Sequence, residues 1–208
     1  MNAFKTGMKF EKHVQSIFVK HGFHVFKETG GSKCGPDISI LYNGVRVNFE
    51  CKTKNAFEGG GRVLHVNNGK LRTCDTFFDS LLNGVDIWGG RVPQFKLGNK
   101  DFTVWMNESM HFKDIWIDID STSVARYYAC RDIHYVIIEK TGIYHTGKNP
   151  MNIHCPYFEC HNRLRIRCKR HSSSSMPSSV QASLVFSKKL LKKFSHSKST
   201  YGTHGRIC

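Results

Sequence analysis

A tight hairpin is the feature that most constrains the fold of this 208-residue chain. Two runs with strand-like character, DISILY at 37–42 and VRVNFECK at 45–52, are joined by Asn43-Gly44. Asn-Gly is the pair that best accommodates the positive φ angles of a two-residue type I′ turn. The sequence therefore predicts two antiparallel strands, and we expect Asp37 and Glu50, each six residues from the turn, to meet at their open end.

Charged side chains gather at this open end. Because side chains alternate between the two faces of a strand, Glu50 and Lys52 share one face and Cys51 lies on the other. Two neighbouring carboxylates repel each other unless a cation lies between them. Hard divalent ions such as Mg²⁺ prefer oxygen ligands and suit such a pair. A neighbouring lysine can orient water and stabilise charge that develops on a phosphoryl group.

The elements around the hairpin indicate an α/β fold with a mixed sheet. Apolar residues at helical spacing predict a helix that ends at Gly22, and FHVFKE at 23–28 predicts a strand. Asp75 is a candidate N-cap of a short helix. The three glycines at 59–61 indicate a loop or a linker. Further elements are expected downstream, namely strands at 102–106, 115–119 and 133–140 and a helix around 123–129.

Positive charge is concentrated at the end of the chain. The formal net charge is +15, and residues 163–208 hold 11 of the 31 Lys and Arg but none of the 16 acids. This imbalance indicates a contact segment for a polyanion such as nucleic acid. The Ser-rich stretch 172–179 predicts a linker, so that residues 172–208 would form a linker and a basic tail. The run LVFSKKLLKKF at 184–194 fits a short amphipathic helix or a strand, and it would serve equally as a DNA arm, a targeting segment or a membrane-surface segment.

Composition argues against several other classes of protein. No run approaches the roughly 18 apolar residues of a membrane span, so none is expected. The first residues lack the apolar region of a secretory signal, which predicts an intracellular protein, cytoplasmic or nuclear. The eight Cys then indicate reduced thiols rather than a disulfide framework. A zinc site is not expected, because HCPYFECH at 154–161 lacks closely spaced Cys pairs.

The order Pro36-Asp37, twelve residues, then Glu50-Cys51-Lys52 resembles the PD-(D/E)XK nuclease superfamily. The preceding helix with Glu11 and the hairpin itself match the family's context. Within the superfamily, residues 5–55 look most like archaeal-type Holliday junction resolvases and related small viral and phage nucleases. The resemblance implies a restriction-endonuclease-like core, with a central mixed β-sheet flanked by helices. That domain would span 1–171, with its catalytic core at 5–90 and additional α/β elements at 100–160, and the basic C-terminal extension would follow it.

The resemblance also implies roles for individual residues. Asp37 and Glu50 would be catalytic metal ligands together with the carbonyl group of Cys51. Lys52 would be the catalytic lysine, and Glu11 would assist metal or water binding. The family places a hydroxyl residue in the loop before the aspartate, which Thr29 or Ser32 would supply. The residues expected to contact nucleic acid are Ser32, Lys54, Lys188, Lys189, Lys192 and Lys193.

Together these features predict a Mg²⁺-dependent endodeoxyribonuclease, with Mn²⁺ as an alternative ion. The expected substrate is branched or junction DNA in recombination, repair or replication, and two symmetric nicks imply a homodimer. Two alternatives are a restriction or replication nuclease without junction preference, and a catalytically inactive DNA-binding module. The intact set of Asp37, Glu50 and Lys52 favours an enzyme over the inactive module.

Overall fold

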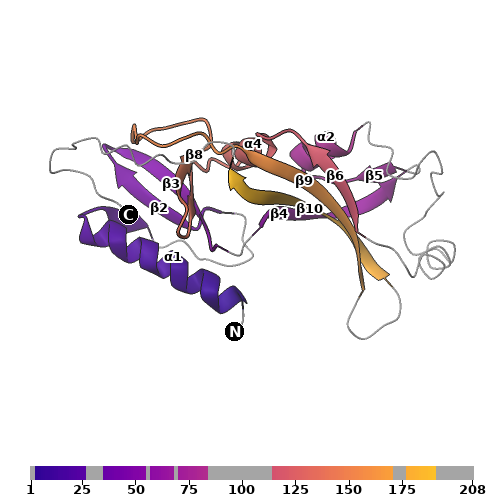
Figure 1. Cartoon of the computed structure of the whole chain (residues 1–208), viewed down its shortest axis with the longest axis horizontal. Helices are drawn as coiled ribbons and strands as arrows, with labels where there is room; N and C mark the ends of the chain where they lie inside the picture. The colour runs from indigo at the N-terminus through magenta and orange to yellow at the C-terminus, as the bar shows by residue number, and fades with distance from the viewer. Residues whose placement is uncertain are drawn as a thin grey trace. The chain divides into compact units, whose positions relative to one another are not determined.

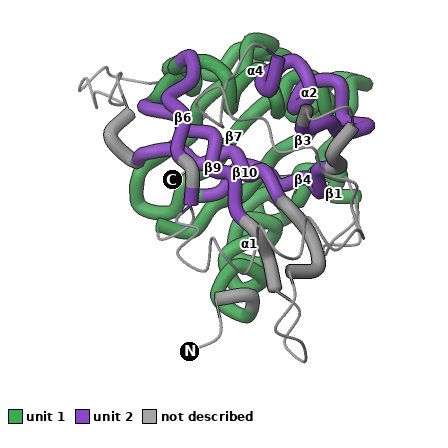
Figure 2. The backbone as a smooth tube through the Cα atoms, turned by 90° about the vertical axis from the view of Figure 1, so that its right-hand side faces the viewer, with its two compact units in different colours: residues 1–57, 121–160, 188–208 green, residues 58–120, 161–187 purple. Residues whose placement is uncertain are grey.

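A computed structural model describes residues 3–26, 35–54, 57–67, 70–83, 114–170 and 177–190. The chain divides into two compact units, coloured separately in Figure 2. Unit 1 comprises residues 1–57, 121–160 and 188–208, and unit 2 comprises residues 58–120 and 161–187. The chain therefore passes between the units several times, and residues from both halves of the sequence build each of them.

Unit 1 contains a five-stranded sheet in the order β1-β2-β3-β7-β8. Most neighbours are antiparallel, but β3 and β7 are parallel, so the sheet is mixed as predicted. The helices of this unit are α1 and α4. The bounds are α1 Ala3–Lys20, β1 His24–Phe26, β2 Ile38–Tyr42, β3 Val45–Lys52, α4 Ser123–Cys130, β7 Tyr135–Ile138 and β8 Gly142–His145.

The helix α1 packs on the sheet of unit 1 through one apolar face (Figure 1). Phe18 and Val14 are 1% and 6% exposed and share a core cluster with Phe49 of β3. The helix ends as predicted at Gly22, whose φ of 81° is readily adopted by glycine. Phe23 N donates to the Phe18 carbonyl (3.0 Å) and Gly22 N to the Val19 carbonyl (3.0 Å), a Schellman ending.

The predicted hairpin is confirmed. Asn43 and Gly44 have φ angles of 49° and 76°, both positive as a type I′ turn requires. Tyr42 pairs with Val45 beside the turn, and Ile38 pairs with Phe49 near the open end. The register therefore places the start of β2 against the last residues of β3, where the charged side chains lie.

Unit 2 contains a second five-stranded sheet, in the order β5-β4-β10-β9-β6. Asp75 caps the short helix α2 as predicted, because its Oδ1 accepts a hydrogen bond from Phe78 N at 3.1 Å. The glycines at 59–61 lie within β4 rather than in a loop. The bounds are β4 Glu58–Asn67, β5 Lys70–Arg72, α2 Thr76–Leu82, β6 Ile115–Ile119, β9 Cys160–Arg170 and β10 Pro177–Leu190.

The structure differs from the expected linker and tail over residues 177–190. These residues form β10, which lies between β4 and β9 in the sheet of unit 2. Ala182, Leu184 and Phe186 alternate along it and are all at most 1% exposed. This buried apolar row, spaced by two residues, stabilises a strand where the Ser-rich composition suggested a linker.

The segment 100–160 contains several of the predicted elements. The expected strand at 102–106 lies outside the described residues. The additional α/β elements expected at 100–160 include α4 and β7, which belong to the same unit as the hairpin, and β6, which belongs to unit 2. None of the described helices is long and apolar enough to cross a membrane.

Candidate active site at the open end of the hairpin

Two hydrogen bonds to the main chain of β3, one from the Asp37 main chain and one from its side chain, hold Asp37 against the end of this strand. Asp37 N donates to the Phe49 carbonyl at 3.0 Å, which extends the β2–β3 ladder by one residue. The Asp37 Oδ2 atom accepts a hydrogen bond from Cys51 N at 2.7 Å. The aspartate is therefore fixed beside the Glu50-Cys51-Lys52 segment, as its distance in sequence from the turn predicted. Its other oxygen, Oδ1, accepts no hydrogen bond from the described residues.

Glu50 and Lys52 form a close ion pair on the same face of β3. Lys52 Nζ lies 2.5 Å from Glu50 Oε1, and the two side chains are only 17% and 13% exposed. Cys51 points to the opposite face, where it is 7% exposed and joins the core cluster beneath α1. Its burial, and next the charges of Asp37 and Glu50, raise the pKa of the thiol well above its ordinary value, so the sulfur is a neutral core atom.

Glu11 of α1 is the third carboxylate of this site. Its side chain is half-buried, and burial followed by the negative charge of Asp37 raises its pKa, whereas the Lys52 ammonium lowers it. Glu11 is thus an electrostatic neighbour of both Asp37 and Lys52. The structure brings together all four side chains that the sequence singled out.

Burial dominates the electrostatics of the two hairpin carboxylates. The pKa of Asp37 and that of Glu50 are both raised by burial, and Lys52 only partly offsets this effect. For Lys52, burial opposes the ammonium, but the oxygens of Tyr128, Glu50 and Asp37 outweigh it and raise its pKa. The site therefore holds three poorly solvated carboxylates around one firmly protonated lysine, an arrangement that favours a further cation.

The donor chemistry of this site fits a hard divalent cation. Asp37 Oδ1, Glu50 Oε2 and the main-chain carbonyl group of Cys51 are all oxygens, the ligand type that Mg²⁺ and Mn²⁺ prefer. Within the described ranges, no group of three His, Cys, Asp or Glu side chains is gathered closely enough to form a metal site by itself. A cation here would thus draw on water and main-chain oxygen as well as on carboxylates.

The Cys and His residues of the 154–161 segment have separate surroundings. Burial raises the pKa of Cys155 to about 11 and that of Cys160, with help from Glu159, to about 12. His161 Nε2 instead lies 3.3 Å from Asp118 Oδ1. The two cysteines are thus buried, neutral thiols in this structure.

Two residues of this site had no sequence signal. Tyr128 of α4 is 2% exposed, and its hydroxyl is an electrostatic neighbour of Lys52, Glu50 and Asp37. Arg131, just beyond α4, slightly offsets the rise that burial causes in the pKa of Glu50. Its guanidinium group also donates a hydrogen bond to the Tyr127 hydroxyl at 2.6 Å. Neither residue lies near the hairpin in sequence, so spacing rules could not link them to it.

The predicted nucleic-acid contacts are described only in part. Lys54 is exposed two residues beyond Lys52, and its main-chain N donates to Glu139 Oε2 at 3.1 Å. Ser32 and Thr29 lie outside the described residues. The same holds for Lys192 and Lys193 and for the side chains of Lys188 and Lys189.

Comparison with known proteins yields one distant structural likeness. No protein-family model matches the chain, and no curated protein matches it. Among solved structures, the chain is similar to HhaI endonuclease in complex with DNA, with 16% sequence identity and a TM-score of 0.45. The match covers 84% of this chain and 65% of the endonuclease chain, so this chain spans less than two thirds of that protein's length. A likeness at this level identifies no site residue, and the site is interpreted from its own geometry.

Proposed function

We propose that the protein is a metal-dependent endonuclease that hydrolyses phosphodiester bonds of DNA. The observation that carries this proposal is the pair of buried carboxylates at the end of β3. Cys51 N holds Asp37 at 2.7 Å, Lys52 Nζ holds Glu50 at 2.5 Å, and the half-buried Glu11 is an electrostatic neighbour. Desolvated like charges lower the stability of a fold, and they are typical of sites where a ligand or a reaction makes use of them.

Asp37, Glu50 and the carbonyl group of Cys51 would hold Mg²⁺ or Mn²⁺. When bound, such a cation acts as a Lewis acid that polarises the scissile phosphate and makes water more acidic. The hydrogen bond from Cys51 N to Asp37 Oδ2 at 2.7 Å supports this role, because it fixes the carboxylate through one oxygen and leaves Oδ1 as the proposed ligand. The close pairing of Glu50 with Lys52 fixes the second ligand in the same way.

Lys52 would act as an ammonium group rather than as a base. Its pKa is raised by Tyr128, Glu50 and Asp37 despite its burial, so it stays protonated at neutral pH. A fixed ammonium can donate hydrogen bonds to the attacking water and to a phosphate oxygen that gains charge in the transition state. Glu11, whose pKa is raised by burial and by Asp37, would accept the proton of the water.

Lysines of α1 support a polyanionic substrate. Lys5, Lys9 and Lys12 are exposed and follow the i, i+4, i+7 spacing that places residues on one face of a helix. No ion pair joins any of the three to another described residue, so their charge is available to a partner. We propose that they contact DNA phosphates on the same helix that carries Glu11, together with Lys54 and the basic end of the chain.

Branched DNA is the substrate that we propose within this class, on the resemblance of residues 5–55 to junction resolvases. Paired nicks on a junction would require two copies of the site and hence a homodimer. A nuclease that cuts DNA irrespective of branching would use the same four residues. The two variants of the proposal differ in substrate preference and agree on chemistry.

One experiment tests the proposal and its variants together. A labelled four-way junction and a linear duplex of matched sequence are incubated with the full chain in Mg²⁺, in Mn²⁺ and in EDTA. We expect cleavage that needs the cation, is lost in Asp37→Asn and is kept in the control Asp118→Asn, whose carboxylate is 74% exposed. Equal cutting of both substrates would overturn the junction preference alone. Salt-sensitive binding without cutting in either cation would overturn the nuclease and support a DNA-binding module.

A further inference from the structure

One deeply buried hydroxyl of unit 1 lacks a hydrogen-bond partner among the described residues. Tyr128 is 2% exposed, and its buried Oη atom forms no hydrogen bond with any described residue. A buried polar group that forms no hydrogen bond costs stability, and phenylalanine would fill nearly the same volume without that cost. Such a group therefore calls for a reason other than folding, and a bound ligand or a catalytic role is among the usual ones.

The fold anchors Tyr128 close to the end of β3. The Tyr128 carbonyl accepts a hydrogen bond from Ile133 N at 3.0 Å, just beyond the end of α4. The next residue, His134, donates from its N to the Asn48 carbonyl at 2.9 Å, two residues before Glu50. The Tyr128 hydroxyl is an electrostatic neighbour of Lys52, whose ammonium group pairs with Glu50.

Cation binding would change the surroundings of Lys52. In the structure its ammonium contacts Glu50 Oε1 at 2.5 Å. A carboxylate that ligates a divalent cation holds an ammonium less strongly, because part of its charge is compensated and the cation repels the lysine. The ammonium has three N–H donors, and a neutral phenol oxygen can accept from it without competing for the metal.

Building on the proposed nuclease function, we propose that Tyr128 is a positioning residue that holds Lys52 when a cation occupies the site. The phenol oxygen would accept a hydrogen bond from Lys52 Nζ, and the phenol O–H would be left to donate to water. The hydroxyl that forms no hydrogen bond in this structure would then form its hydrogen bonds once the cation is bound. Tyr128 acts through Lys52 and does not itself transfer a proton.

The test compares Tyr128→Phe with a matched control, Tyr135→Phe. The Tyr135 hydroxyl is also in unit 1, but it donates to Asn149 Oδ1 at 2.5 Å and accepts from Met151 N at 3.0 Å. Single-turnover cleavage, the Kd for DNA and the midpoint of thermal unfolding in EDTA are measured for the full chain and both variants. Lysine-ammonium NMR with Mg²⁺ and an uncleavable DNA reports solvent exchange of the Lys52 N–H protons.

We expect opposite patterns from the two variants. Tyr128→Phe should cleave about 10-fold more slowly, on the scale of lost supporting contacts in metal sites, with an unchanged Kd and an unfolding midpoint equal to or above that of wild type. Its Lys52 protons should exchange faster. Tyr135→Phe should cleave normally but unfold a few degrees earlier, because it loses the two hydrogen bonds of the Tyr135 hydroxyl.

Several results would overturn the inference. A Tyr128→Phe variant that cleaves at the wild-type rate, or that loses rate only together with thermal stability, would leave Tyr128 as a core residue. An unchanged exchange rate of the Lys52 protons would do the same. Absence of cleavage by wild type in Mg²⁺ and Mn²⁺ would instead overturn the proposed function, and the inference with it.

Discussion

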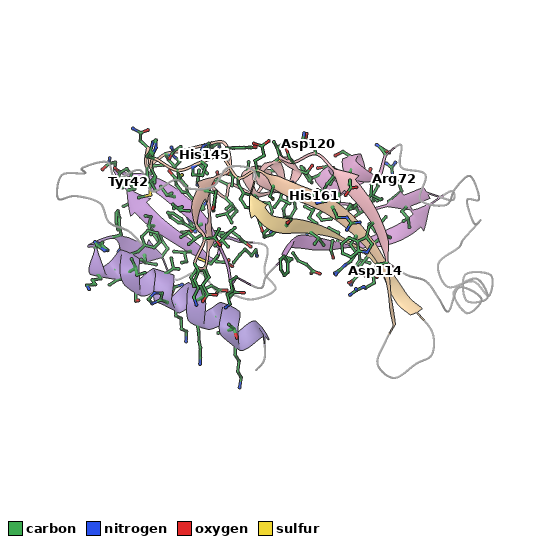
Figure 3. The ribbon with its side chains drawn as sticks, viewed as in Figure 1. Tyr42, Arg72, Asp114, Asp120, His145 and His161 are labelled. Carbon is green, nitrogen blue, oxygen red and sulfur yellow. The ribbon has the colours of Figure 1, made fainter. Side chains whose placement is uncertain are left out.

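In unit 2 three arginines of β9 each lie against a carboxylate. In unit 1 three carboxylates surround one lysine, and Arg131 adds only a minor effect on Glu50. Arg163 Nε is 3.3 Å from Asp118 Oδ1, Arg165 pairs with Glu58, and Arg167 binds Asp114 through two contacts of 2.5 and 2.7 Å. Figure 3 labels Asp114, which directly precedes β6. Charge in unit 2 is therefore locally balanced, and charge in the hairpin site is not.

The same comparison corrects the interpretation of the basic C-terminal stretch. Arg163, Arg165 and Arg167 lie in a sequence segment without acids, which suggested a surface open to nucleic acid. In the fold, β9 pairs with β6, and Arg163 and Arg165 also lie over the Trp116 ring, at 4.8 and 5.8 Å from its centroid. Acids from distant parts of the chain neutralise all three arginines, so these arginines serve the fold.

The balanced pairs of unit 2 and the unbalanced carboxylates of unit 1 indicate which of the two charged regions binds a ligand. A balanced pair close to the surface adds little free energy and needs no further partner. An unbalanced, poorly solvated cluster destabilises the fold until a counter-ion or substrate compensates it. By this criterion the hairpin site is the candidate ligand-binding site, whereas the three arginines of β9 contribute to packing.

The largest effect is expected from Glu50→Gln. This change removes a proposed metal ligand and one of the crowded charges, so cleavage should fall by on the order of 10²–10³-fold, while stability in EDTA should stay equal or rise. Cleavage kinetics and chemical unfolding measure the two effects. In unit 2, Asp114→Asn should do the reverse, with normal cleavage and a small loss of stability. Equal kinetic losses in both variants would break the comparison.

Removing the basic side chain should lower the free energy of unfolding more in the hairpin site of unit 1 than in the ion pair of unit 2. Lys52→Met leaves buried, unpaired carboxylates and should destabilise the metal-free protein by about 3 kcal/mol. Arg167→Met removes a half-exposed partner and should cost less than about 1 kcal/mol. Urea unfolding provides both values. Addition of Mg²⁺ should restore part of the loss only for Lys52→Met, and a metal-independent loss would argue against a cation site.

The lysines of α1 should control the salt dependence of DNA binding. The triple change of Lys5, Lys9 and Lys12 to Gln should reduce the log–log slope of affinity against salt concentration by about 2–3, since each phosphate contact contributes close to 0.9. Fluorescence anisotropy at several salt concentrations gives the slope. The control Arg163→Gln should leave it unchanged, because that guanidinium is already paired with Asp118. A slope that changes only in the control would place the DNA surface on β9.

The smallest predicted effect is that the pKa values of two aspartates shift in opposite directions on folding. The hydrogen bond from Arg167 lowers the pKa of Asp114 below 3.8, and burial raises that of Asp37 above 3.8. Asp114 therefore contributes stability above its unfolded pKa that is lost as pH falls through its folded pKa. Asp37 contributes stability in acid that is lost as pH rises from 3.8 through its folded pKa. Carbon-detected NMR titration in EDTA should show this order, and the reverse order would contradict the assigned environments.

Local features of the sequence predicted much of the site. Asn43-Gly44 specified the hairpin, and the register then placed Asp37 beside Cys51. The helix ending at Gly22 was predicted because its chemistry is contained in a few neighbouring residues.

Features that depend on distant residues were beyond the sequence. The parallel pairing of β3 with β7 and the presence of Tyr128 join segments far apart in the chain, and no spacing rule links them. The glycines at 59–61 are accommodated in β4 because β10 lies against them: a Cβ atom on Gly61 would come within 3.3 Å of Ser183 Oγ. Tertiary pairing overrides local propensity at such positions.

Binding of Mn²⁺ by the full chain, measured by the EPR signal of the free ion, tests the central claim most directly. The account predicts saturable binding that Mg²⁺ displaces, that Asp37→Asn and Glu50→Gln each abolish or weaken by at least about 10-fold, and that Asp118→Asn leaves unchanged. Saturable binding that survives both hairpin substitutions, or no binding at millimolar Mn²⁺ in the presence of DNA, would contradict the proposed cation site.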